Sequence, residues 1–98
     1  ITIVAGGTIT LDSGGSPTNV VSAVGTGTIS IDANGASSDI VVNDGISSAS
    51  GDITLTADND VIFAAEGDIV STSGNVAVTA DADNGGATSG ALTMNDLP

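Results

Sequence analysis

A short phrase recurs four times along this chain and constrains its fold more than any other feature. Each copy begins with Gly, followed by a small or polar residue and then two branched apolar residues at alternate positions. The copies read GTITLDS from Gly7, GTISIDA from Gly27, GDITLTA from Gly51 and GNVAVTA from Gly74. Self-similarity at this period predicts a stacked repeat architecture, because no single unit can bury its own apolar face.

The alternation of apolar and polar residues within each phrase predicts a strand, since side chains of a strand point to opposite faces with period two. The inward pairs are Ile9 and Leu11, Ile29 and Ile31, Ile53 and Leu55, and Val76 and Val78. The next inward position is small in every copy, as a corner requires: Ser13, Ala33, Ala57 and Ala80. Stacked coil upon coil, these residues would form continuous aliphatic columns. No helical stripe of useful length is present, so no helix longer than a turn is expected.

Two further strands are expected in each coil. Ile46, Ile69 and Leu92 predict one of them, and the stretches 19–24, 39–42 and 61–64 predict a middle one. The predicted fold is therefore all-β: a right-handed parallel β-helix (β-solenoid) of about four coils, with roughly 20–24 residues per coil. The coils would span residues 7–26, 27–50, 51–73 and 74–96 of a single domain 1–98, with residues 1–6 ending a preceding coil. The alternative is an immunoglobulin-like β-sandwich, which has a similar length but antiparallel strands.

All charged side chains of this protein are acidic. It has 12 acidic residues and no Lys, Arg or His, which gives a formal net charge of −12. Nucleic acid and anionic membrane surfaces are excluded as partners, because nothing here neutralises phosphates. No apolar run approaches the length that inserts in a membrane. Each carboxylate must face water, accept a hydrogen bond or bind a cation.

Residues 51–85 read GDITLTADNDVIFAAEGDIVSTSGNVAVTADADNG. This stretch resembles the repeats of giant secreted bacterial proteins, the filamentous-haemagglutinin-like adhesins, which are parallel β-helix proteins. The resemblance implies secretion, display at the bacterial cell surface, and adhesion or matrix building. A composition rich in Ser and Thr but without Lys or Arg also favours an extracellular location. The hydroxyl groups would accept O-linked glycans, whereas no Asn-x-Ser/Thr triplet is present.

Acidic residues gather after the third and fourth phrases. They are Asp58 and Asp60 in one coil and Asp81, Asp83 and Asn84 in the next. Stacking would place Asp81 over Asp58 and Asp83 over Asp60, about 4.8 Å apart. Calcium would relieve the repulsion, because it takes six to eight oxygen ligands in flexible geometry. We therefore predict a calcium site at these five residues. The alternative is a solvated acidic turn whose side chains splay apart.

A second acidic pair is predicted at the outward position that follows each inward pair. There, Asp12 would stack on Asp32 as surface charge.

The sequence predicts a structural role rather than an enzyme. No His, Cys, Lys or Tyr is available as a base or nucleophile. Both ends of a short solenoid expose unpaired strand edges, which invite pairing with another chain unless they are capped. We therefore predict a subunit or repeat segment of an extracellular filament, joined to itself head to tail or in a tandem array and stabilised by calcium. The alternative is an adhesin module that binds a surface or carbohydrate partner.

Overall fold

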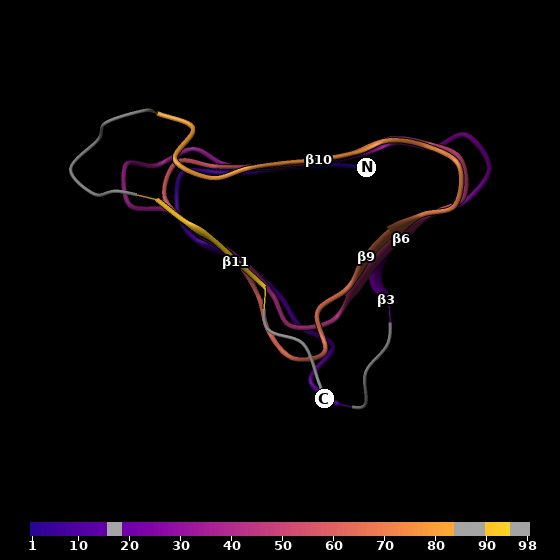
Figure 1. Ribbon diagram of the computed structural model, residues 1–98, viewed down its shortest axis with the longest axis horizontal. Coiled ribbons are helices and arrows are strands. Elements are labelled where there is room, and N and C mark those ends of the chain that lie inside the picture. The colour runs from indigo at the N-terminus through magenta and orange to yellow at the C-terminus, as the bar shows by residue number, and fades with distance from the viewer. Residues whose placement is uncertain (16–18, 84–89, 95–98) are drawn as a thin grey trace.

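The chain winds into a three-sided solenoid (Figure 1). The computed structural model describes residues 1–15, 19–83 and 90–94, which form eleven strands and no helix. The strands are β1 (Thr2–Ala5), β2 (Ile9–Leu11), β3 (Asn19–Ala23), β4 (Ile29–Ala33), β5 (Ile40–Val42), β6 (Gly45–Ser48), β7 (Ile53–Ala57), β8 (Val61–Phe63), β9 (Ile69–Ser71), β10 (Val76–Thr79) and β11 (Leu92–Met94). Figure 1 looks along the shortest of the three dimensions, 38 × 30 × 21 Å, and successive turns of the chain superimpose in this view.

Each side of the solenoid is one parallel sheet. Sheet A has the order β1-β4-β7-β10, sheet B has the order β2-β5-β8-β11, and sheet C has the order β3-β6-β9. Every strand pair among the described residues is parallel, which excludes the immunoglobulin-like sandwich. The predicted all-β solenoid is confirmed, with about three turns in place of about four.

The predicted aliphatic columns are confirmed for the second, third and fourth phrases. Ile53 pairs with Ile29 on one side and with Val76 on the other, and Leu55 pairs in the same way with Ile31 and Val78. The small corner residues Ala33 and Ala57 are also in register. Like side chains therefore lie above one another, one strand spacing apart.

The first phrase is placed differently from the prediction. Its strand β2 lies in sheet B, where Ile9 pairs with Ile40 and Leu11 with Val42. On its N-terminal side β4 pairs with β1, so residues 1–6 supply the first rung of sheet A. Residues 1–6 and the first phrase both alternate apolar and polar residues. This alternation predicts a strand in each segment, but it does not tell which of the two strands lies in sheet A.

Two corner insertions explain the other differences in phase. Seven residues separate β2 from β3, whereas two separate β5 from β6. Because β2 already lies in sheet B, β3 lies in sheet C beside β6, and not in the middle strand position where residues 19–24 were predicted. Twelve residues separate β10 from β11, whereas three separate β7 from β8. Counting a constant period therefore put Leu92 over Ile69, but Leu92 pairs with Val61 in sheet B.

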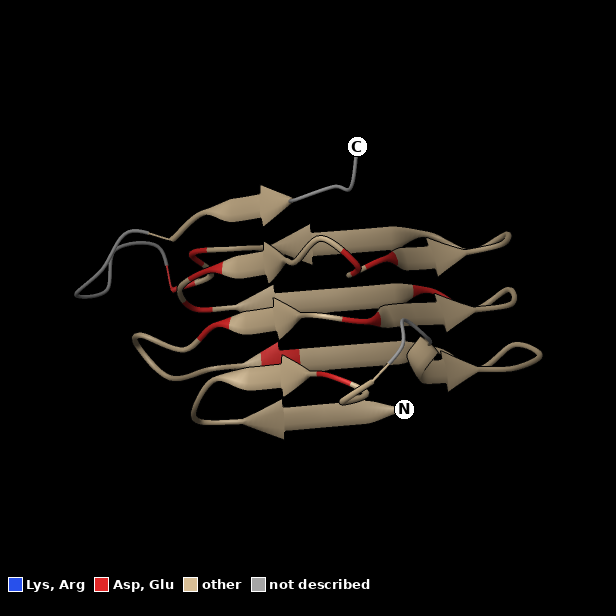
Figure 2. Cartoon of the chain, turned by 90° about the horizontal axis from the view of Figure 1, so that it is seen from below, with Lys and Arg blue, Asp and Glu red and all other residues tan. Residues whose placement is uncertain are grey.

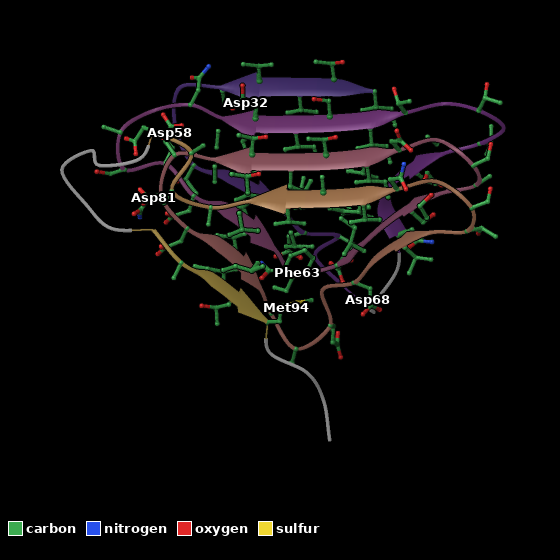
Figure 3. All side chains as sticks on the ribbon, turned by 45° about the horizontal axis from the view of Figure 1, so that its top comes forward. Asp32, Asp58, Phe63, Asp68, Asp81 and Met94 are labelled. Atoms are coloured by element: carbon green, nitrogen blue, oxygen red, sulfur yellow. The ribbon has the colours of Figure 1, made fainter. Side chains whose placement is uncertain are left out.

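The core is a narrow aliphatic column between the three sheets. Its fully buried members are Ile29, Ile31, Ile40, Val42, Ile46, Ile53, Leu55, Val61 and Phe63. Phe63, the single aromatic residue of the chain, lies in β8 and points into the interior (Figure 3). Small branched side chains suffice because no point of the interior lies far from a sheet.

The repeated glycine allows the backbone of successive turns to approach closely. Gly27, Gly51 and Gly74 each precede a strand of sheet A. A Cβ atom on Gly51 would overlap the carbonyl oxygen of Gly27, and one on Gly74 would overlap that of Gly51. The Gly51 carbonyl also accepts hydrogen bonds from the buried Ser48 hydroxyl at 2.6 Å and from the Ser71 hydroxyl at 3.0 Å.

Gly7 begins the same phrase but occupies another corner, and a Cβ atom there would meet nothing within 4 Å. We therefore expect Gly51→Ala to lower the free energy of unfolding by about 1–3 kcal/mol, the usual cost of overpacking. Gly7→Ala is the matched control and should change it by less than about 1 kcal/mol. Urea unfolding followed by circular dichroism measures both. Equal effects of the two substitutions would contradict the corner assignment.

Candidate functional site: an acidic corner and two open ends

Side-chain oxygens link successive rungs where the strands of sheet B begin. Thr8, Asp39, Asp60 and Ala91 are the residues just before β2, β5, β8 and β11. The Asp39 N–H donates to Thr8 Oγ1 at 3.2 Å, and the Asp60 N–H donates to Asp39 Oδ1 at 3.0 Å. The Ala91 N–H then donates to Asp60 Oδ1 at 2.8 Å. Asp39 and Asp60 are therefore built into the stacking of the coils.

The same device occurs in sheet A, where the Asn75 N–H donates to Asp52 Oδ1 at 2.8 Å. Asp39 also accepts a hydrogen bond from Asn59 Nδ2 at 2.8 Å. The sequence analysis did not predict that these carboxylates accept hydrogen bonds from the next rung. The sequence feature that could have indicated this role is a residue with a side-chain oxygen directly before successive strands, as at Thr8, Asp39 and Asp60.

One buried carboxylate holds the corner between sheets B and C. Asp44 is 3% exposed, and its Oδ2 accepts a hydrogen bond from the Ser13 N–H at 2.6 Å. The N–H groups of Asn43 and Asp44 both donate to the Leu11 carbonyl oxygen. By accepting this hydrogen bond, the Asp44 carboxylate supports the main chain of the preceding turn at Ser13.

Carboxylates gather at the corner between sheets A and B, where Figure 3 shows Asp32, Asp58 and Asp81. Partial burial raises the pKa of Asp58, and the charges of Asp83 and Asp32 raise it further. Asp32 comes from β4, Asp58 follows β7, and Asp83 follows β10, so three successive rungs contribute one group each. We call Asp32, Asp58, Asp81 and Asp83 the acidic corner.

The main chain shifts by one residue within the acidic corner, at Asp81. In the rung below, the Asp58 N–H donates to the Ala33 carbonyl oxygen, but here it is Ala82, one residue later, that donates to Ala57. The Asp81 N–H instead donates to the Asn59 carbonyl oxygen at 2.8 Å. Asp81 has a φ of 56°, and its Oδ1 is buried without a hydrogen-bond partner. Such an atom is costly unless something satisfies it.

The five predicted calcium ligands do not act as one group in the part of the chain that the structure describes. Asp58 and Asp83 interact electrostatically, Asp60 is hydrogen-bonded to Ala91, and Asn84 lies outside the described residues. Within residues 1–15, 19–83 and 90–94, no three His, Cys, Asp or Glu side chains are gathered as metal ligands. The calcium site stays a prediction.

The expected stacking of Asp12 on Asp32 is wrong. Asp32 pairs in register with Val4 and Thr56 in sheet A. Asp12 follows β2 in sheet B, where its Oδ1 accepts from the Gly14 N–H at 2.8 Å and its Oδ2 accepts from Asn43 Nδ2 at 3.4 Å. The error follows from the placement of the first phrase on the wrong side of the solenoid.

The two ends of the solenoid present unpaired strands (Figure 2). The edge strands are β1, β2 and β3 at the N-terminal end and β10, β11 and β9 at the C-terminal end. In the last rung, Leu92 is 48% exposed and Met94 is 63% exposed, whereas their partners Val61 and Phe63 in the rung below are almost fully buried. The apolar column therefore continues to the surface at the C-terminal end.

No protein-family model matches this chain, and no curated protein or solved structure matches it either. The structure is that of a parallel β-solenoid, the class that the sequence resemblance implied. Among the described residues, no helix is long and apolar enough to cross a membrane.

We expect Asp58→Asn to raise the thermal unfolding midpoint at pH 7. A carboxyl group whose pKa is raised by folding destabilises the folded state while it is ionised, and this cost disappears as the pH falls through its folded-state pKa. The advantage of the variant over the wild type should therefore shrink on acidification. Asp68→Asn, which removes an exposed carboxylate elsewhere, controls for the loss of one negative charge. Equal shifts for the two variants would show that the acidic corner carries no special repulsion.

Proposed function

We propose that this chain is a structural subunit or repeat segment of an extracellular filament, and that it associates end to end through the open edges of its solenoid. The observation that carries the proposal is the exposed apolar column at the last rung, flanked by strands with one unpaired edge. Exposed, apolar strand edges template pairing with another chain. A contact that joins unlike ends and does not close generates a filament.

The edge strands that the structure describes carry little protection, and this supports the same proposal. Proteins that remain monomeric commonly place Lys, Pro or a bulge on their edge strands, or cover them. The chain has no Lys, and β1, β10 and β11 contain no Pro. Among the described edge strands, only β3 has a register shift, between Asn19 and Val21.

The proposed location is outside the cell, at a bacterial surface. The composition supports it, since a chain without Lys, Arg or Cys and rich in Ser and Thr is unusual for the cytosol. The outward face of sheet A carries hydroxyl groups on neighbouring strands, at Ser30, Thr54, Thr56 and Thr79. We propose these as positions for O-linked glycans.

Calcium at the acidic corner is the second part of the proposal. The buried, unpartnered Oδ1 of Asp81 and the mutual repulsion around Asp58 support a cation there. Calcium accepts carboxylate and carbonyl oxygens in irregular geometry.

We expect millimolar calcium to raise the thermal unfolding midpoint of the wild-type chain more than magnesium does at equal ionic strength. Ligand at 100 times its dissociation constant would add about 2.7 kcal/mol. Asp58→Asn combined with Asp83→Asn should abolish the difference between the two ions. A midpoint that responds equally to calcium and magnesium would contradict this part of the proposal.

End-to-end association is tested by sedimentation velocity and negative-stain microscopy over a range of protein concentrations. We expect the wild-type chain to form rods that lengthen with concentration, and Met94→Asp to abolish them, because a carboxylate would then lie in the apolar contact. Val70→Asp is the matched control: Val70 is 54% exposed but points outward from sheet C, so this variant should still assemble. A compact monomer at every concentration, especially one that binds a surface component or carbohydrate, would favour the adhesin module instead.

A further inference from the structure

We infer that two copies of this chain join head to tail in one register, in which Ile3 of one copy lies on Val78 of the other while Ile9 lies on Leu92 and Leu11 on Met94. The inference rests on the proposed end-to-end association and specifies its geometry. In this register β10 pairs with β1, and β11 with β2, of the second copy. The joint then repeats the stacking that already exists within one chain.

Continuity of the aliphatic columns supports this register. In sheet A, Ile3, Ile31, Leu55 and Val78 form one column across all four rungs. In sheet B, one column runs from Ile9 through Ile40 and Val61 to Leu92, and the other from Leu11 through Val42 and Phe63 to Met94. Each column thus begins and ends with an apolar residue. A shift by one residue would turn the inward side chains of the second copy outward.

The distribution of charge favours contact between unlike ends. The first 28 residues contain one of the 12 acidic residues, Asp12, and β1 carries no carboxylate (Figure 2). The last rung carries Asp81 and Asp83 at its corner. Because the Asn34 N–H donates to the Ala5 carbonyl oxygen, Gly6 occupies this corner in the first rung. A head-to-tail joint therefore places an uncharged corner on the acidic one.

Two symmetric arrangements, in which like ends meet, are less favourable than the head-to-tail joint. Two C-terminal ends in contact would bring both sets of Asp81 and Asp83 to one interface, with no cation from Lys or Arg to offset them. Two N-terminal ends in contact would leave Leu92 and Met94 exposed on both copies. A head-to-tail joint covers both kinds of end and preserves parallel pairing throughout.

Sheet C distinguishes the joint from the interior of the chain. Sheets A and B have four strands each, whereas sheet C has three in the described residues. In the inferred register, β9 and the β3 of the second copy lie two strand spacings apart, about 9–10 Å. Sheets A and B therefore carry the contact.

Spin labelling tests the register, and the chain has no Cys to interfere. Val4 and Thr79 point outward in the same column of sheet A, so the joint would bring them one strand spacing apart, about 4.8 Å. Val4→Cys and Thr79→Cys chains, each carrying a nitroxide, are mixed at a concentration at which they assemble. We expect dipolar broadening of the electron paramagnetic resonance spectrum in the mixture. Thr2→Cys with Ala77→Cys, the neighbouring outward column, is a second pair in the same register.

Single-variant samples and a mismatched pair serve as controls. Thr10→Cys points outward from sheet B, so its mixture with Thr79→Cys should remain sharp. Broadening in Val4→Cys or Thr79→Cys alone would indicate symmetric contact of like ends and overturn the inference. Rods without broadening in either matched pair would overturn the register but leave end-to-end association standing. If the labelled and the unlabelled chains both sedimented only as monomers, the register and the end-to-end association would both be overturned.

Discussion

The structure depends on one interaction: the parallel main-chain pairing of equivalent residues in successive turns. Once a rung is paired in register, its inward side chains lie on those of the next rung, and the aliphatic column forms without large residues. The glycine corner serves the same pairing, because Gly51 and Gly74 let each turn approach the one before it to strand spacing. So do the carboxylates of Asp39 and Asp60, which accept the N–H group of the next rung.

The same interaction explains why the ends matter. A globular protein closes its core on all sides, but a stacked column has a beginning and an end at which apolar side chains and strand edges meet water. In this chain the C-terminal end is the more exposed of the two, since Ile9 and Leu11 near the N-terminal end remain almost buried while Leu92 and Met94 do not. The proposed filament and its inferred joint are extensions of pairing already present within the chain.

Sequence reasoning was most successful where successive repeats have almost the same length. The columns through Ile29, Ile53 and Val76 were predicted correctly because 24 and 23 residues separate them and the intervening corners are alike. It failed in the first and last turns, where a longer corner changes the number of residues between equivalent strands although the order of the sheets stays the same. At the acidic corner, the predicted stacking of Asp81 on Asp58 and of Asp83 on Asp60 differs from the structure. Ala82 takes the place above Asp58, Asp83 acts on Asp58, and Asp60 supports the main chain at Ala91. The alternation of apolar and polar residues specifies a strand and its buried face, but not the strand with which it pairs.

The sequence by itself determined that this chain forms strands, that branched aliphatic residues line the interior, and that no intramolecular Lys or Arg partner exists for its carboxylates. These properties follow from local alternation and composition. Only the tertiary structure decided which strand lies on which, which carboxylates meet at the acidic corner, and which apolar residues stay uncovered. The physical reason is that strand pairing joins residues more than 20 positions apart, and each inserted corner residue changes their phase without altering the local pattern that the sequence displays.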